Sequence, residues 1–207
     1  MNITAIFVEL LIIGFGVLCW LTLIIAYFLG LKIDSSLFNI KPILIAPLTS
    51  IAYIFGIVTD RLLRDPFVFL IENPSKKIIH KEYQSKFNNL KKISVDVKES
   101  FKPMELEKYV RANSPQLGQK IDYNRNRLRI CRAWVLHFLL ITIAFILWNS
   151  KVKVTDGAPM IGIIVTGFIL FGLTLFTSIK LSIDHQRDII ESSEIILMNK
   201  KQNTKEN

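Results

Sequence analysis

Apolar residues gather into four long and almost uncharged runs, which are separated by two short polar loops and one long polar segment. The runs cover residues 3–31, 42–59, 133–150 and 157–179. A helix needs about 20 mostly apolar residues to cross a hydrocarbon core of roughly 30 Å. The first and fourth runs exceed this length, and the second and third lie near the lower end of the range. The pattern therefore predicts four transmembrane helices.

A soluble fold does not account for this pattern. The chain has 207 residues, of which 51% are hydrophobic, and a soluble domain would disperse them along periodic, half-buried elements. If these four uncharged runs formed the core of a soluble protein, the remaining polar residues would be too few to shield them from water. We therefore predict an all-α integral membrane protein whose spans form two hairpins. The first run follows no lysine or arginine and is too long for a signal peptide, so we expect it to remain as a span.

The long polar segment between the hairpins carries local helix signals. Ser75 and Ser114 suit helix caps, whereas Pro103 and Pro115 suit a first helical position. No further proline interrupts the chain between Pro115 and the end of the third run. We therefore expect one helix to begin in the polar segment and continue through the third span. Apolar residues spaced seven apart beyond the fourth run predict a similar extension of that span.

These signals divide the chain into a first hairpin (1–59), a basic and mainly helical segment (60–132), a second hairpin (133–181) and a helical extension with a disordered tail (182–207). Lysine and arginine are unevenly distributed among these parts. Of 26 basic residues, seventeen lie in the segment between the hairpins and five lie from Lys180 onward, whereas only four lie in the two short loops. Basic residues accumulate on the cytoplasmic side of membrane proteins. We therefore expect a multi-pass protein of the inner (plasma) membrane with both termini and the basic segment in the cytoplasm.

Arginines cluster where the basic segment meets the third span. Arg125, Arg129 and Arg132 are spaced four and three apart, which places them on one face of a helix. Arg61 and Arg64 follow the second span and are expected on the same side of the membrane. These five residues are candidates for binding an anion or a protein partner. The alternative is that they orient the helix and contact anionic lipid headgroups. Nucleic acid is disfavoured, because no aromatic residues for base stacking interleave with the arginines.

Two polar residues interrupt the predicted spans. Glu9 is the only carboxylate within a span, and His137 lies about one turn inside the third. An ionisable group inside a membrane is costly and therefore suggests a function in permeation or proton transfer. The alternative for Glu9 is placement near the cytoplasmic interface or pairing with an arginine there.

Glycines mark surfaces where helices approach closely. They are Gly14 and Gly16 in the first span and Gly162, Gly167 and Gly172 in the fourth. Small residues allow close contact between helices in membranes. These positions therefore predict packing among the four spans, or else a subunit interface or pore lining. Because four helices alone make a small bundle, we expect a homo-oligomer.

The sequence contains no nucleophile elbow, phosphate-binding loop, dinucleotide-binding glycine pattern or paired-histidine zinc motif. Cys19 and Cys131 indicate neither a disulfide framework nor metal-ligand spacing. We therefore expect no catalysis, no metal and no cofactor. The leading hypothesis is a membrane scaffold or sensor whose basic cytoplasmic segment binds a soluble protein or an anionic signal. An ion channel or pore-forming effector gated from the cytoplasm, and an enzyme acting on lipid, remain as alternatives.

The arrangement of four spans, short outer loops and a cytoplasmic insert is similar to that of small membrane components of bacterial antiphage systems. Examples are the membrane subunit of Kiwa and the four-helix effectors of nucleotide-signalling defence. The resemblance lies in architecture alone and transfers no functional residue. It implies a role in bacterial antiviral defence.

Overall fold

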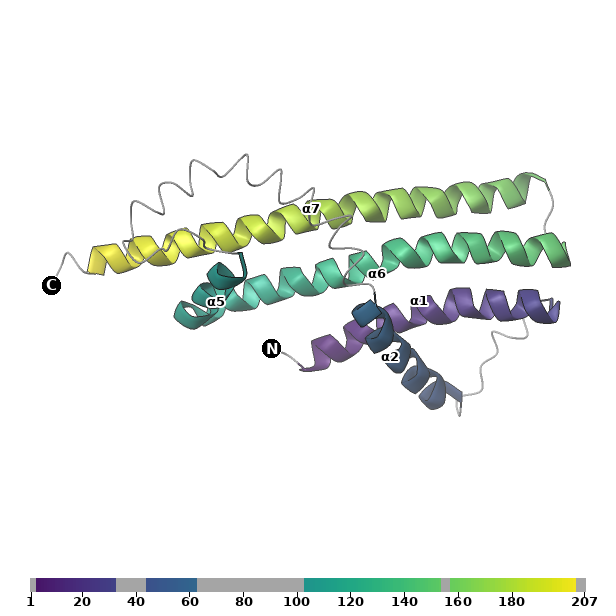
Figure 1. Ribbon diagram of the computed structural model, residues 1–207, viewed down its shortest axis with the longest axis horizontal. Coiled ribbons are helices and arrows are strands. Elements are labelled where there is room, and N and C mark those ends of the chain that lie inside the picture. Colours follow the sequence, from purple (N-terminus) through teal and green to yellow (C-terminus); the bar gives the residue numbers. More distant parts are fainter. Residues whose placement is uncertain (1–2, 33–43, 63–102, 154–156, 204–207) are drawn as a thin grey trace. The chain divides into compact units, whose positions relative to one another are not determined.

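The computed structural model describes residues 3–32, 44–62, 103–153 and 157–203 (Figure 1). Within these ranges the chain forms five α-helices and no strand, which confirms the predicted all-helical fold. The helices are α1 (Ile3–Leu29), α2 (Ile45–Leu62), α5 (Pro103–Asn113), α6 (Pro115–Val152) and α7 (Ala158–Asn203). The helix predicted from Ser75 and the candidate residue Arg64 lie outside the described residues.

Four of these helices, α1, α2, α6 and α7, are long and apolar enough to span a membrane. This number matches the four predicted spans, and it supports a multi-pass membrane protein. The shortest, α2, has 18 residues, which is close to the minimum for crossing a bilayer. In the apolar stretch of α7 the described chain buries no side chain. Such a surface is suited to contact with lipid or with another apolar helix.

Two of the helix starts predicted in the polar segment are also confirmed. Helix α5 begins at Pro103 and α6 at Pro115. The backbone amide of Leu117 faces the Ser114 hydroxyl oxygen at 3.5 Å, as expected for a residue that caps α6. Helix α6 then runs for 38 residues and α7 for 46, so each continues well beyond its apolar run.

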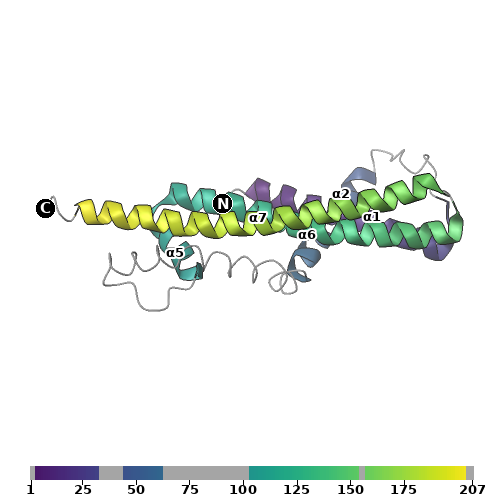
Figure 2. The same ribbon diagram turned by 90° about the horizontal axis from the view of Figure 1, so that it is seen from above.

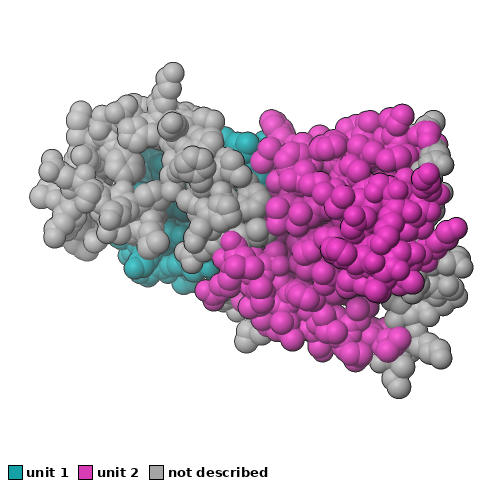
Figure 3. Space-filling view, turned by 45° about the vertical axis from the view of Figure 1, so that its right-hand side comes forward, with its two compact units in different colours: residues 1, 68–128, 178–207 teal, residues 2–67, 129–177 magenta. Residues whose placement is uncertain are grey.

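The chain divides into two compact units, coloured separately in Figure 3. Unit 2 contains α1, α2, α6 from Arg129 onward, and α7 as far as Thr177. Unit 1 contains α5, α6 as far as Leu128, and α7 from Ser178 onward. Both α6 and α7 therefore contribute to both units.

In unit 2, α1 and α2 cross with their backbones in contact (Figures 1 and 2). A Cβ atom at Gly14 would overlap the carbonyl oxygen of Ala52, and one at Gly56 would overlap that of Leu10. Each helix therefore offers a glycine to the backbone of the other, one turn apart. This reciprocal arrangement explains why Gly14 and Gly56 cannot carry side chains here.

At the other end of α1, side chains of α6 bind one carbonyl group of its last turn and one just beyond its end. Trp148 Nε1 donates to the Leu31 carbonyl at 2.9 Å, and Lys151 Nζ donates to that of Phe28 at 3.1 Å. Gly30 adopts a φ of 65°, the left-handed conformation that commonly ends a helix at glycine. Because the last carbonyls of a helix lack intrahelical partners, the Lys151 bond caps α1, and both bonds hold α6 beside it.

Unit 1 has its own small apolar core. Leu106 and Val110 of α5, Ile121 of α6 and Ile189 of α7 are buried together, and Leu117 and Ile196 pack around them. The three helices therefore share one core, and a charged network described below covers part of it.

Candidate functional site

Three charged residues from three helices meet in unit 2. We call Glu9 of α1, Asp60 of α2 and Arg129 of α6 the Arg129 cluster. The Arg129 guanidinium donates to both carboxylate oxygens of Asp60, with Nε to Oδ1 at 3.0 Å and Nη2 to Oδ2 at 2.7 Å. Its Nε also lies 3.4 Å from Glu9 Oε1. One guanidinium therefore links α6 to both helices of the first hairpin.

Burial makes this cluster costly to disturb. The Glu9 side chain is only 2% exposed, and those of Arg129 and Asp60 are 22% and 25% exposed. A buried carboxylate requires a nearby opposite charge, because water no longer solvates it. The structure thus places Glu9 in an ion pair, which was one of the two alternatives that its sequence position allowed. Asp60 is recognisable as charged from the sequence, but its pairing with a residue 69 positions away is not.

His137 lies further along α6 and is fully buried. A Cβ atom at Gly16 would overlap its imidazole ring, so the missing side chain at Gly16 provides the space that the ring occupies. Trp134 packs edge-on against the same ring, with centroids 5.6 Å apart. Gly16 is therefore a packing residue for His137 within unit 2.

The three candidate glycines of α7 have different surroundings. A Cβ atom at Gly167 would overlap the Thr142 hydroxyl, so this glycine lies at a close contact with α6. At Gly162 and Gly172 a Cβ atom would meet nothing within 4 Å among the described residues. Gly162 and Gly167 also line an apolar cavity of about 440 Å³ between α1, α6 and α7. Among the three, only Gly167 has a packing role within the described chain.

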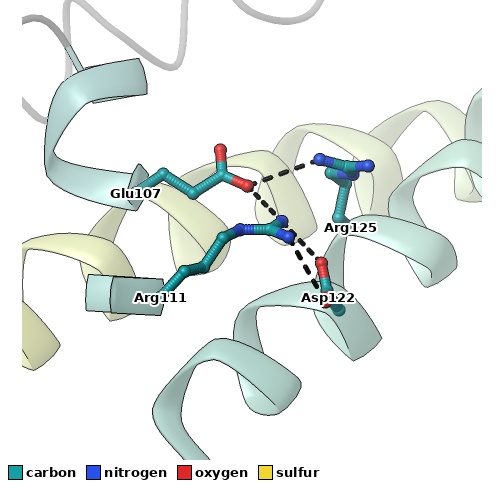
Figure 4. A network of polar contacts seen from close by, with 4 residues as sticks. All are labelled: Glu107, Arg111, Asp122 and Arg125. Carbon is teal, nitrogen blue, oxygen red and sulfur yellow. Dashed lines mark hydrogen bonds and ion pairs between the residues drawn. The ribbon is translucent and has the colours of Figure 1, made fainter. Parts of the chain in front are cut away.

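A second charged cluster lies in unit 1, where α5 meets the first part of α6 (Figure 4). We call Glu107, Arg111, Asp122 and Arg125 the Glu107 network. Arg111 Nη2 lies 2.5 Å from both Glu107 Oε1 and Asp122 Oδ1, and Arg125 Nη1 lies 3.4 Å from the same Glu107 oxygen. Charges therefore alternate along the network, and each arginine has a carboxylate partner.

The Glu107 network stabilises the charged form of Arg111. Burial alone would lower the pKa of this guanidinium, but the hydrogen bonds and negative charges of Glu107 and Asp122 outweigh that effect and raise it. The i, i+4 spacing of Glu107 and Arg111 is the one sequence signal that could have revealed this pair. The contact with Asp122 joins separate helices, so it depends on the tertiary structure.

Helix α7 joins α6 within unit 1 through Asp188. Lys120 Nζ lies 2.6 Å from Asp188 Oδ1, and the Asn124 side-chain amide donates to Oδ2 of the same carboxylate. Polar contacts thus connect all three helices of unit 1 around its apolar core. We refer to this bundle of α5 and the unit 1 parts of α6 and α7 as the polar module.

The candidate arginines on α6 contact different parts of the chain. Arg125 belongs to the Glu107 network and Arg129 to the Arg129 cluster. Arg132 is partly buried in unit 2, and Arg61 is exposed on the last turn of α2. The guanidinium groups of Arg125 and Arg129 already neutralise carboxylates of this chain, so an added anion would compete with those partners.

The described residues hold no group of three or more histidine, cysteine or acidic side chains suited to a metal ion. Cys19 and Cys131 form no disulfide bond. The two charged clusters consist of arginine–carboxylate pairs, which hold helices together and are not arranged as nucleophile and base.

No family model, curated protein or solved structure matches this chain.

Proposed function

We propose that this chain is a non-catalytic scaffold or sensor of the inner membrane, whose polar module lies in the cytoplasm and binds a soluble protein or an anionic signal. In this proposal both termini are cytoplasmic, and several copies of the chain assemble into a homo-oligomer. The architectural resemblance noted above makes bacterial antiphage defence its proposed setting.

The observation that carries the proposal is the continuity of α6 and α7. Each contains an apolar stretch of membrane-spanning length, and each also contributes buried residues to the core of the polar module. A helix transmits displacement along its axis because its backbone hydrogen bonds keep it stiff. In this proposal, binding at the polar module acts on the apolar stretches through these two continuous helices.

The ion pairs of α6 support such a coupling. Arg125 pairs with Glu107 in unit 1, and Arg129, one turn later, pairs with Asp60 and Glu9 in unit 2. A shift of α6 at this point would disturb both clusters, because charged hydrogen bonds depend strongly on distance and angle. This would bias the arrangement of α1 and α2 when the polar module binds its partner.

Site-specific photo-cross-linking of the full-length protein in cells tests partner binding. A photoreactive residue replaces Lys108 or Ala112 of α5, or Gln119 of α6, all of which are exposed on the polar module. The matched control carries it at Phe176, which is 67% exposed on the apolar part of α7. We expect a soluble protein adduct at one or more module positions and none at Phe176. Absence of adducts from all three module positions would contradict partner binding.

The orientation is tested separately by cysteine labelling. After replacement of Cys19 and Cys131 by alanine, one cysteine is introduced at Gln119 or at Lys153. We expect a membrane-impermeant maleimide to label Lys153→Cys in intact cells, and to label Gln119→Cys only after the membrane is opened. The reverse pattern would place the polar module outside the cell.

The buried Glu9 carboxylate favours a second candidate function, an ion channel, because charged groups within membrane spans often line ion pathways. Flux of potassium from liposomes that contain the purified protein distinguishes this function from the scaffold. A conductance that Glu9→Gln removes and Arg187→Gln preserves would favour the channel. A silent wild-type protein would favour the scaffold.

A further inference from the structure

One face of α6 in the polar module carries exposed basic and aromatic side chains. Lys120, Tyr123 and Arg127 are spaced three and four apart, so they lie on the same side of the helix. The side chains of Lys120 and Tyr123 are 59% and 62% exposed, and Arg127 is also exposed. The Arg127 guanidinium lies over the Tyr123 ring, 5.5 Å from its centroid. We call these three residues the Tyr123 face.

Arg127 differs from the arginines around it. Arg111, Arg125 and Arg129 each pair with carboxylates, whereas no carboxylate of the described residues pairs with Arg127. Its contact with the Tyr123 ring is a cation–π interaction, which orients the guanidinium without neutralising its charge. Because the Arg127 side chain is exposed and no described carboxylate pairs with it, its donors suit a carboxylate or phosphate ligand.

The position of Arg127 along α6 favours a soluble ligand over lipid. It precedes Ala133, the first residue of the apolar run, by six residues, which is about 9 Å of helix rise. The headgroup layer on one side of a bilayer is only roughly 5–8 Å thick. Side chains on a helix also tilt toward its N-terminus, here away from the apolar run, and Arg127 lies over Tyr123 in that direction. For a span that begins at Ala133, the guanidinium therefore lies beyond the headgroups.

We propose that the Tyr123 face binds an acidic segment of a soluble protein partner, with Arg127 paired to a carboxylate of that segment and Tyr123 as the central contact. The inference rests on the proposed function and specifies its partner. Tyrosine and arginine are enriched among residues that dominate binding energy at protein interfaces. The cation–π contact holds the guanidinium in place before binding, which reduces the entropy lost on association.

The experiment uses the full-length protein with the photoreactive residue at Gln119, which lies on the same side of α6, one turn before Tyr123. We expect a soluble protein adduct whose cross-linked peptide, identified by mass spectrometry, is rich in aspartate and glutamate. Arg127→Gln should reduce the adduct yield about tenfold, equivalent to about 1.4 kcal/mol of binding. The charge-matched control Lys108→Gln, at an exposed position of α5, should leave the yield unchanged. Higher ionic strength should reduce the wild-type yield.

Tyr123 is tested by two further changes. Tyr123→Phe retains the ring beneath Arg127 and should preserve most of the adduct, whereas Tyr123→Leu should reduce it. An equal loss in Arg127→Gln and Lys108→Gln would overturn the inference, because it would indicate unspecific attraction to a basic module. A lipid adduct, or a cross-linked peptide without acidic residues, would also overturn it. Protein adducts at Lys108 or Ala112 but not at Gln119 would refute this face while leaving the proposed function intact.

Discussion

Removal of the Arg129 side-chain charge is expected to destabilise the protein through the buried Glu9 carboxylate. In Arg129→Gln, Glu9 loses the guanidinium that lies 3.4 Å from its Oε1 while remaining 2% exposed. Two unit charges at this separation attract by about 5 kcal/mol at an effective dielectric constant of about 20. The cost of desolvating both groups offsets part of this attraction in the native protein. Breaking a buried pair by removing one partner nevertheless costs about 3–5 kcal/mol.

The assay is denaturant-induced unfolding of the purified protein in detergent micelles, monitored by circular dichroism. We expect Arg129→Gln to lower the free energy of unfolding by about 3 kcal/mol. Glu9→Gln should cost less, because the neutral amide tolerates burial better than a carboxylate that has lost this guanidinium. The double variant should be more stable than Arg129→Gln alone, since it no longer buries the Glu9 carboxylate without the Arg129 charge.

The control is Arg187→Gln, which removes one partner of a partly exposed pair. Arg187 and Asp184 are 3.9 Å apart with side chains 38% and 45% exposed, so the loss should be below about 1 kcal/mol. The reasoning would be refuted if Arg129→Gln were no more destabilising than this control. It would also be refuted if the effects of Glu9→Gln and Arg129→Gln simply added, because additivity indicates that the two residues do not interact.

One substitution in each unit tests its packing, and each is compared with a control substitution. Gly14→Ala should destabilise the crossing of α1 and α2 by more than about 2 kcal/mol, because its Cβ atom would overlap the Ala52 carbonyl; Gly172→Ala, in open space, should change unfolding by less than about 0.5 kcal/mol. Equal effects of the two substitutions in the same unfolding assay would contradict the close crossing. Ile121→Ala should cost about 2–4 kcal/mol through a cavity in the polar module, whereas Ile195→Ala, at a side chain 51% exposed, should cost less than about 1 kcal/mol. Amide hydrogen exchange should show faster exchange in α5 for Ile121→Ala, and unchanged exchange there would argue against a shared core.

The amino-acid sequence alone predicts the features that depend on residues close together along the chain. The four helices that are long and apolar enough to span a membrane follow from run length, because the thickness of a bilayer sets a minimum length for a span. The start of α6 follows from Ser114 and Pro115, since a cap and a first-turn proline act on amides within the next few residues. The continuation of α6 and α7 beyond their apolar runs follows from uninterrupted helix-compatible sequence.

The roles of individual side chains were decided by contacts between helices. Arg125, Arg127 and Arg129 occupy neighbouring positions of one helix, yet one pairs with α5, one lies over a tyrosine of its own helix, and one pairs with α1 and α2. Likewise, Gly14 lies against a backbone carbonyl, whereas Gly172 faces open space. Helix formation depends on hydrogen bonds between residues four positions apart, so its signals are local. An ion pair or a close helix crossing joins residues far apart along the chain, and only their arrangement in space determines which partners meet.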